Sequence, residues 1–146
     1  MDLIEVLINN RTEIINKSVN LLNRAHLKNY NELNETERTK KLSILYDLAL
    51  KCIKNKNIID IVEYSEKIAA ERFNKGFDFH EVHTAFNVLE EAMWESILNN
   101  MAPEEYGEAL GFVSTVLGAG KESLANTFIQ LSAKTKVRNL DLSSLR

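Results

Sequence analysis

The residues that most resemble a chemical site form the segment Gly118-Ala119-Gly120-Lys121-Glu122-Ser123. A phosphate-binding loop uses glycines whose amides cradle phosphate, then a lysine, then a Ser or Thr that holds magnesium. Here Thr115 stands where the first glycine belongs, and Glu122 replaces the magnesium-binding hydroxyl. No strand pattern precedes the segment. The sequence therefore does not predict nucleotide binding.

The histidines could in principle hold a metal ion or haem. His80 and His83 lie three residues apart, with Glu81 between them. Metal sites in helical bundles use a Glu-x-x-His spacing on paired helices, and that spacing is absent from this chain. Surface histidines are the better interpretation, and we predict no metal site. A haem ligand among His26, His80 and His83 stays open, although no sequence feature supports one.

The remaining reactive side chains do not form a catalytic pattern. Cys52 falls on an apolar stripe, with no neighbour in sequence that marks it as a nucleophile, which favours a buried thiol. Several carboxylates lie on helix faces, but nothing in their surroundings indicates the desolvation that acid/base catalysis needs. They are Glu63, Glu66, Glu90, Glu91 and Glu95. We therefore predict no catalytic residues, no cofactor and no enzymatic activity.

Composition indicates a single globular domain. The chain has 146 residues, of which 45% are hydrophobic and 27% charged, with one proline and one cysteine. A lone cysteine excludes an intramolecular disulfide and is typical of a reducing compartment. There is no run of 18 apolar residues, the acidic start of the chain is unlike a secretory signal, and the net charge of −3 gives no reason to expect nucleic acid. We expect a cytoplasmic protein that binds neither membrane nor nucleic acid.

Charge is distributed in three blocks. Residues 1–56 carry 10 Lys or Arg against 7 Asp or Glu, residues 57–110 carry 3 against 12, and residues 111–146 carry 5 against 2. The middle block is therefore net −9 and each flank net +3. The acidic block either faces basic neighbours within a bundle, faces a basic partner, or forms a solvated acidic face.

Apolar residues recur at three- and four-residue spacing along the chain, which predicts helices and no strands. We expect five helices, over residues 2–28, 35–54, 58–75, 79–101 and 103–134, with a loop at 29–35. Asn10 with Glu13 matches an internal capping box, which predicts a break or kink of the first helix there. Asn34 with Glu37, and Asp78 with Glu81, are capping boxes at the starts of the second and fourth helices. Gly76 follows the third helix at a position that favours positive φ.

Two of these helices have a clear apolar face. In the fourth, Phe79, Val82, Phe86, Leu89 and Met93 form a seam, and Trp94, Ile97, Leu98 and Met101 widen it. In the fifth, the face consists of Tyr106, Leu110, Val113, Leu117, Leu124, Phe128 and Leu131. Short connections favour antiparallel neighbours, so the predicted fold is an all-α, up-and-down antiparallel bundle of four to five helices. The regulatory domain is expected over 1–134, and residues 135–146 as a linker stub or tail.

The fifth helix contains an anomaly. Four of the five glycines lie between residues 107 and 120, and each costs about 1 kcal/mol relative to alanine inside a helix. Gly107, Gly111, Ser114 and Gly118, which we call the glycine ridge, recur at spacings of 4, 3 and 4 and so lie on one side of the helix. Such a ridge lets another backbone approach closely.

The sequence leaves three explanations of the ridge open. These are close packing inside the monomer, a seam with a second subunit or a partner helix, and a break of the helix at 118–120. The predicted interface consists of Tyr106, Gly107, Leu110, Gly111, Val113, Ser114, Leu117 and Gly118. Arg72 and Trp94 belong to residue types favoured at interface hot spots, although edges of the helix core explain them equally well.

One stretch resembles a known family. Residues 72–82, Arg-Phe-Asn-Lys-Gly-Phe-Asp-Phe-His-Glu-Val, continue as Ala85-Phe86-Asn87-Val88-Leu89 and join two predicted helices. This helix, glycine stop, acidic cap and long helix resemble the N-terminal domains of bacterial stress-response regulators of the RsbT co-antagonist type and, less closely, the RsbU phosphatase type. Residues 112–120 also look like the last bundle helix of the phosphatase group. The resemblance covers about 58–130.

The resemblance implies a sensory or partner-binding module, usually dimeric, that responds to a signal or binds a switch kinase and controls a C-terminal output domain. It offers no catalytic residues to carry over, and the chain has no room for the output domain. We therefore expect either an excised N-terminal domain or a stand-alone adaptor, which homodimerises and works by protein–protein contact in a stress-response or partner-switching pathway. The alternative is a small-molecule or haem sensor with a pocket in the bundle core.

Overall fold

The computed structural model describes residues 2–139, and side chains up to residue 136. Within that range the chain is entirely helical apart from its connections, as the sequence predicts. The helices are α1 (Leu3–Asn9), α2 (Arg11–Arg24), α3 (Lys28–Asn31), α4 (Glu35–Asn55), α5 (Ile59–Asn74), α6 (Phe79–Asn100) and α7 (Tyr106–Asn139), with a 3-10 turn at Pro103–Glu105 before α7.

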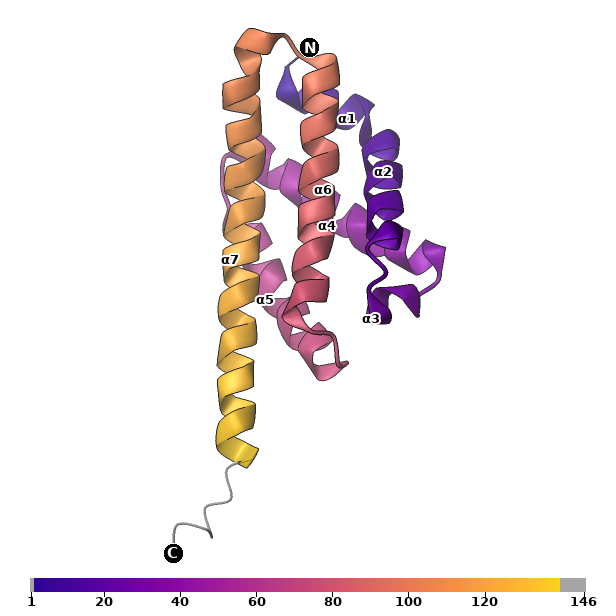
Figure 1. Ribbon diagram of the computed structural model, residues 1–146. Helices are drawn as coiled ribbons and strands as arrows, with labels where there is room; N and C mark the ends of the chain where they lie inside the picture. Colours follow the sequence, from indigo (N-terminus) through magenta and orange to yellow (C-terminus); the bar gives the residue numbers. More distant parts are fainter. Residues whose placement is uncertain (1, 140–146) are drawn as a thin grey trace, which may run out of the picture.

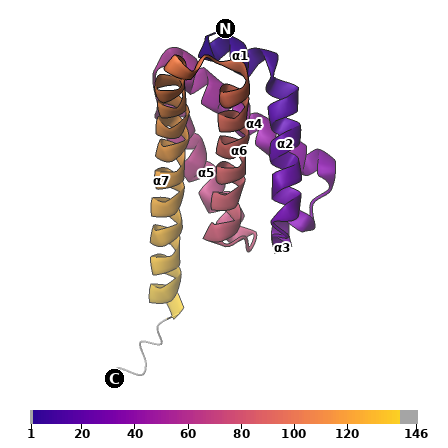
Figure 2. The same cartoon turned by 45° about the horizontal axis from the view of Figure 1, so that its top comes forward.

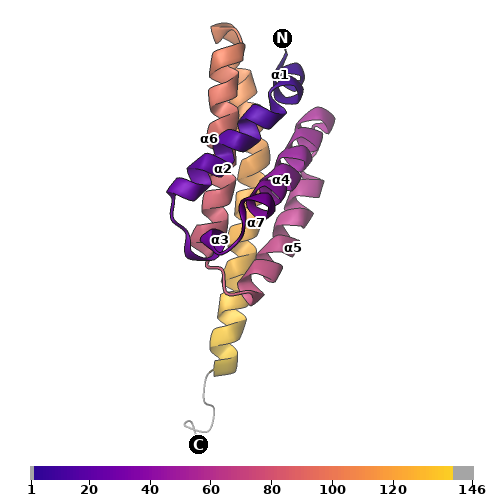
Figure 3. The ribbon, with the colours of Figure 1, turned by 90° about the vertical axis from the view of Figure 1, so that its right-hand side faces the viewer.

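The five long helices form an up-and-down bundle. Consecutive long helices run in opposite directions, and α6 and α7 form a hairpin that lies in front of α4 and α5 (Figure 1). Around the bundle α2 packs on α6, α6 on α7, α7 on α5, α5 on α4, and α4 on α2. Viewed from the side, α2 crosses α6 at a steep angle while α4 and α5 lie next to each other (Figure 3). The α6/α7 hairpin therefore turns one side outward, away from α4 and α5.

The core follows the predicted apolar seams. Val82, Phe86, Leu89 and Met93 of α6 are fully buried, as are Val113, Leu117 and Leu124 of α7. Two residues of the predicted α6 arc are exceptions, since Trp94 is 38% exposed and Leu98 is 48% exposed. They lie at the exposed edge of the predicted arc, and for Trp94 this exposure is compatible with both interpretations from the sequence, an interface anchor and an edge of the helix core.

Local hydrogen bonds at the helix ends fix the start of α4, the end of α5 and the start of α6 near the positions predicted from the sequence. Asn34 with Glu37, and Asp78 with Glu81, form the two predicted capping boxes. After α5, Gly76 has φ +88°, and the amide of Phe77 donates to the carbonyl of Arg72 at 2.9 Å. This bond, together with one from the Gly76 amide to the Phe73 carbonyl, is a Schellman motif.

The first predicted helix is divided into α1 and α2. The break falls at Asn10, as predicted, but the capping box there is wrong. The Asn10 side-chain amide donates instead to the carbonyl of Val6 at 2.9 Å, so it caps the end of α1 and not the start of α2. The chain then turns at His26, which has φ 51°, and the predicted loop at 29–35 contains the short helix α3.

The last helix is longer than predicted. It begins after a 3-10 turn at Pro103 and continues without a break through Gly118 and Gly120. The explanation that the glycines divide this helix is therefore wrong. Residues 135–139 prolong α7 rather than starting a tail, and 140–146 lie outside the described residues. The lower part of α7 extends beyond its neighbours (Figure 2).

Candidate functional site

The glycine ridge lies open on the surface. A Cβ atom placed on Gly107, Gly111 or Gly118 would meet no other heavy atom within 4 Å, leaving out the helix's own nearby backbone. Close packing within the monomer therefore does not explain these three glycines. Gly120 is different, because a Cβ there would lie 3.0 Å from both Phe86 Cε2 and Ser65 Oγ. Only this last glycine of α7 is required by the monomer's own packing.

The predicted interface residues divide into two groups. Val113 and Leu117 are fully buried in the monomer core, so they are not available to a second chain. Tyr106, Leu110, Ser114 and Gly118 are partly exposed, and Gly107 and Gly111 are exposed. Six of the eight predicted interface residues are therefore exposed to solvent, at least in part, on the outward side of α7.

Helix α6 adds large apolar side chains beside this ridge. Trp94 lies one helical turn after Glu90, whose carboxylate bonds Lys121 of α7, and Leu98 lies one turn after Trp94, so both exposed side chains are on the α7 side of α6. The Tyr106 hydroxyl donates to the Leu98 carbonyl at 2.9 Å. Together Trp94, Leu98, Tyr106, Leu110 and the glycine ridge form one surface, which we call the α6/α7 face. It combines bulky apolar groups on one helix with bare backbone on the other, an arrangement into which another helix can pack.

A chain of polar side chains joins α6 to α7 farther along the same hairpin. Lys121 Nζ lies 3.1 Å from Glu90 Oε1 and 3.1 Å from Asn87 Oδ1, and Asn87 Nδ2 lies 3.2 Å from His83 Nδ1. The Glu90 side chain is only 9% exposed, so the Lys121 ammonium compensates a largely buried carboxylate. Sequence reasoning missed this pair, because Glu90 and Lys121 are separated by 31 residues.

His83 is the titratable end of this polar chain. Burial lowers the pKa of His83, the positive charges of Lys121 and His80 lower it further, and Glu90 opposes the shift. Its ring stacks on Phe79 with 5.0 Å between centroids. The neutral imidazole is thus favoured. Among the described residues, no group of three or more His, Cys, Asp or Glu side chains is arranged to hold a metal ion.

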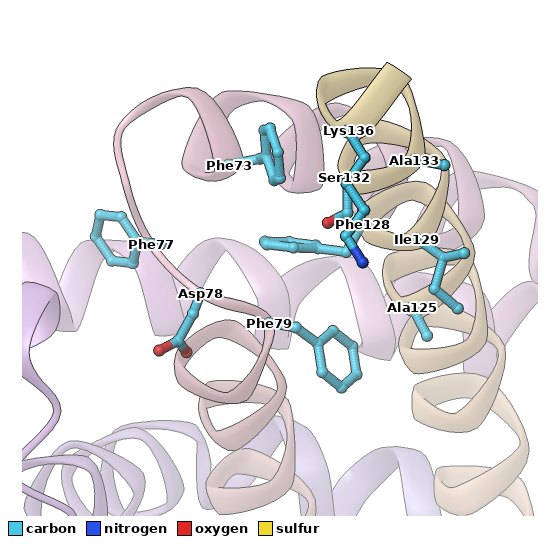
Figure 4. A pocket seen from close by; sticks show the side chains of 10 residues that line it. All are labelled: Phe73, Phe77, Asp78, Phe79, Ala125, Phe128, Ile129, Ser132, Ala133 and Lys136. Atoms are coloured by element: carbon cyan, nitrogen blue, oxygen red, sulfur yellow. The ribbon is translucent and has the colours of Figure 1, made fainter. Parts of the chain in front are cut away.

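An aromatic groove lies at the end of the bundle where α5 turns into α6. It has a volume of about 650 Å³ and is lined by Phe73, Phe77, Asp78, Phe79, Ala125, Phe128, Ile129, Ser132, Ala133 and Lys136. The Phe128 ring projects from α7 and lies between the rings of Phe73 and Phe79, and the other lining residues of α7 lie along the same helix (Figure 4). Each of these two rings makes an edge-on contact with Phe128, with 5.8 Å between centroids. The groove offers apolar surface with one cation, Lys136, and one carboxylate, Asp78.

Two residues singled out from the sequence lie in the core. Cys52 is 2% exposed, and burial raises the pKa of its thiol, which disfavours the reactive thiolate. Arg72 is 5% exposed and donates to the Tyr30 hydroxyl at 2.7 Å, so it is not available as a surface anchor. Sequence reasoning placed Arg72 only as a possible interface or core-edge residue, and no local pattern marks it as buried.

Comparison with known proteins gives no family. No protein-family model, no curated protein and no solved structure matches the chain. Among the described residues, no helix is both long enough and apolar enough to cross a lipid bilayer.

Proposed function

We propose that this chain is a non-catalytic, cytoplasmic regulatory module that homodimerises through its α6/α7 face. The observation that carries the proposal is the open glycine ridge beside Trp94 and Leu98. Three glycines weaken a helix by about 1 kcal/mol each, and they make no contact in the monomer that would offset this cost. A second backbone packed against the ridge offsets it.

The chemistry of the face supports a protein partner over a reactive substrate. Its side chains are aromatic, aliphatic or small, and Lys121 and Glu90 on the same two helices are paired with each other. Aromatic anchors beside small residues are typical of helix–helix interfaces. The pathway that we propose, stress response or partner switching with a switch kinase as partner, rests on the resemblance of residues 58–130 alone.

The test is the mass of the protein in solution. We expect light scattering at micromolar concentrations to give the mass of a dimer for the unmodified chain and of a monomer for Gly111→Leu. The leucine fills the space that the second backbone needs. Lys40→Leu is the control, because residue 40 is exposed on α4, away from the α6/α7 face, and accepts the same side chain there. A monomer at every concentration, or a Gly111→Leu variant that stays dimeric, overturns the proposed interface.

A second function, sensing of an apolar small molecule, is favoured by the aromatic groove. Its volume of about 650 Å³ falls within the range of ligand sites, and four phenylalanines line it. No histidine is among the lining residues, so the groove suits an apolar ligand other than haem. Native mass spectrometry of the purified protein is expected to show an added ligand mass that Ala125→Trp abolishes by filling the groove. Protein that carries no added mass after incubation with fatty acids of 8 to 16 carbons contradicts this function.

A further inference from the structure

Arg72 has an unusual environment for a cation. Its side chain comes from α5 and lies under Tyr30 of α3, with the guanidinium carbon 5.8 Å from the centre of the Tyr30 ring. Arg72 Nη1 donates to the Tyr30 hydroxyl, but the buried Nε has no hydrogen-bond partner. Among the described residues no carboxylate lies within 4 Å of this guanidinium. Burial of a cation with neither a counter-charge nor a full set of hydrogen-bond acceptors destabilises the folded state. The site therefore lacks a negative charge and an acceptor for Arg72 Nε.

A second cation faces the same place. A cavity of about 10 Å³ lies between α3, α4, α5 and α6 and is lined by Tyr30, Lys41, Leu42, Leu45, Tyr64, Ile68, Arg72 and Ala85. Its polar lining thus consists of Lys41, Arg72 and two tyrosines. Burial lowers the pKa of Lys41, and the positive charge of Arg72 adds to that effect. The two cations therefore repel each other across a space that contains no acidic side chain.

The tyrosines do not supply the missing negative charge. Burial raises the pKa of Tyr30 to about 12, and burial also raises that of Tyr64. Both are neutral hydroxyls at physiological pH. The oxygens of Tyr30 and Tyr64 both interact with Arg72, so each hydroxyl keeps its proton to donate, and Tyr64 can donate it to an acceptor in the cavity.

The nearest carboxylates are engaged elsewhere. Glu71 is paired with Lys75 at 3.2 Å, and Glu37 accepts from the Asn34 amide in a capping box. Glu81 is buried, but its oxygens accept from the Asn29 backbone amide at 2.8 Å, from the Asn29 side chain at 2.7 Å and from the Asp78 amide at 3.1 Å. None of these groups lines the cavity.

We propose that this cavity binds one monatomic anion, such as chloride, through Arg72 Nε, the Lys41 ammonium and the Tyr64 hydroxyl. Its volume is close to that needed for a single water molecule, so phosphate and sulfate are too large. Lys41 is only partly buried and closes the site from the α4 side, which leaves it room to adjust around the slightly larger ion. An anion here provides the counter-charge that Arg72 lacks and offsets the repulsion between the two cations.

Thermal unfolding in two salts tests the proposal. A ligand that binds only the folded state raises its stability according to its concentration. We expect the unfolding midpoint of the full chain to be about 3 °C higher in sodium chloride or bromide than in sodium gluconate at the same ionic strength. Lys41→Met is expected to abolish the difference. Lys40→Met removes the same charge from an exposed neighbour and is expected to retain it.

Two observations overturn the anion site. One is equal midpoints in chloride and gluconate for the unmodified chain, and the other is a chloride effect that survives in Lys41→Met. The ³⁵Cl resonance of chloride gives an independent check, since we expect the unmodified chain to broaden it and Lys41→Met to leave it narrow. All variants are compared at one protein concentration, because dimerisation would itself shift the unfolding midpoint. Arg72 stays intact throughout because its removal would threaten folding.

Discussion

Single glycines in α7 occupy opposite environments. In the monomer, a Cβ on Gly111 would meet no other heavy atom within 4 Å, whereas a Cβ on Gly120 would meet Phe86, Ser65 and Ile61. Gly111→Ala should therefore stabilise the isolated monomer by about 1 kcal/mol, because alanine favours the helix. Gly120→Ala should destabilise it by about 1–3 kcal/mol, because its Cβ overpacks the core. Urea denaturation of the two variants, at protein concentrations low enough to dissociate the dimer, measures both effects, and the same sign for both would contradict the environments described here.

The pH dependence of stability has a residue-level origin in His83. Its pKa in the folded state lies below the ordinary value of about 6.5, so between these two values the unfolded chain binds more protons than the folded chain. This contribution to stability is present above pH about 6.5 and is lost as the pH falls toward the folded-state pKa. We expect His83→Gln to reduce the slope of unfolding free energy against pH below about pH 6.5.

His80→Gln is the control for this pH effect. His80 is exposed one turn before His83, and its removal should leave most of the slope in place. Equal slopes for His83→Gln and the unmodified chain would show that His83 does not titrate as its surroundings imply.

At the scale of elements, the connection between α5 and α6 sets the position of the aromatic groove. Gly76 adopts φ +88°, a conformation that costs other residues about 1–2 kcal/mol, yet a Cβ at Gly76 would meet no other atom within 4 Å. Gly76→Ala should therefore lower stability by about 1 kcal/mol through the backbone alone. Gly107→Ala should not lower stability, because a Cβ at Gly107 also meets no other atom within 4 Å and Gly107 does not have a positive φ. A Gly76→Ala variant as stable as the unmodified chain would contradict this explanation.

The elements were largely predictable because their signals are local. The capping boxes at Asn34 and Asp78 and the stop at Gly76 each depend on residues within four positions of one another, and all three are confirmed. Asn10 shows the limit of this approach. The same asparagine side chain can cap the helix before it or the helix after it, and only the folded geometry decides.

The site was less predictable than the elements. Periodicity indicates that Trp94 and Leu98 are apolar neighbours of the core, but it does not indicate which edge of the α6 arc another helix covers. The pair of Glu90 with Lys121, and the burial of Arg72 under Tyr30, join residues more than 30 positions apart. No short-range pattern encodes such contacts, so they emerge only when the helices are placed side by side.

At the scale of the whole molecule, the three charge blocks meet across helix boundaries. Lys51 pairs with Asp60 at 2.9 Å, Lys17 with Glu95 at 3.6 Å, and Lys121 with Glu90 at 3.1 Å. Each pair joins a basic flank of the sequence to its acidic middle. Basic neighbours within the bundle therefore account for part of the block pattern. Because the first two pairs are exposed, their contribution to stability is small.

The central claim is that a second copy of the chain covers the α6/α7 face, and cross-linking tests it most directly. In a Cys52→Ala background, Gly111→Cys places a thiol on the face, and Lys40→Cys places one on the exposed side of α4, away from the face. With a short bifunctional maleimide at micromolar protein, we predict a covalent dimer from Gly111→Cys and only monomer from Lys40→Cys. No covalent dimer from Gly111→Cys, or equal yields from both variants, would contradict the claim.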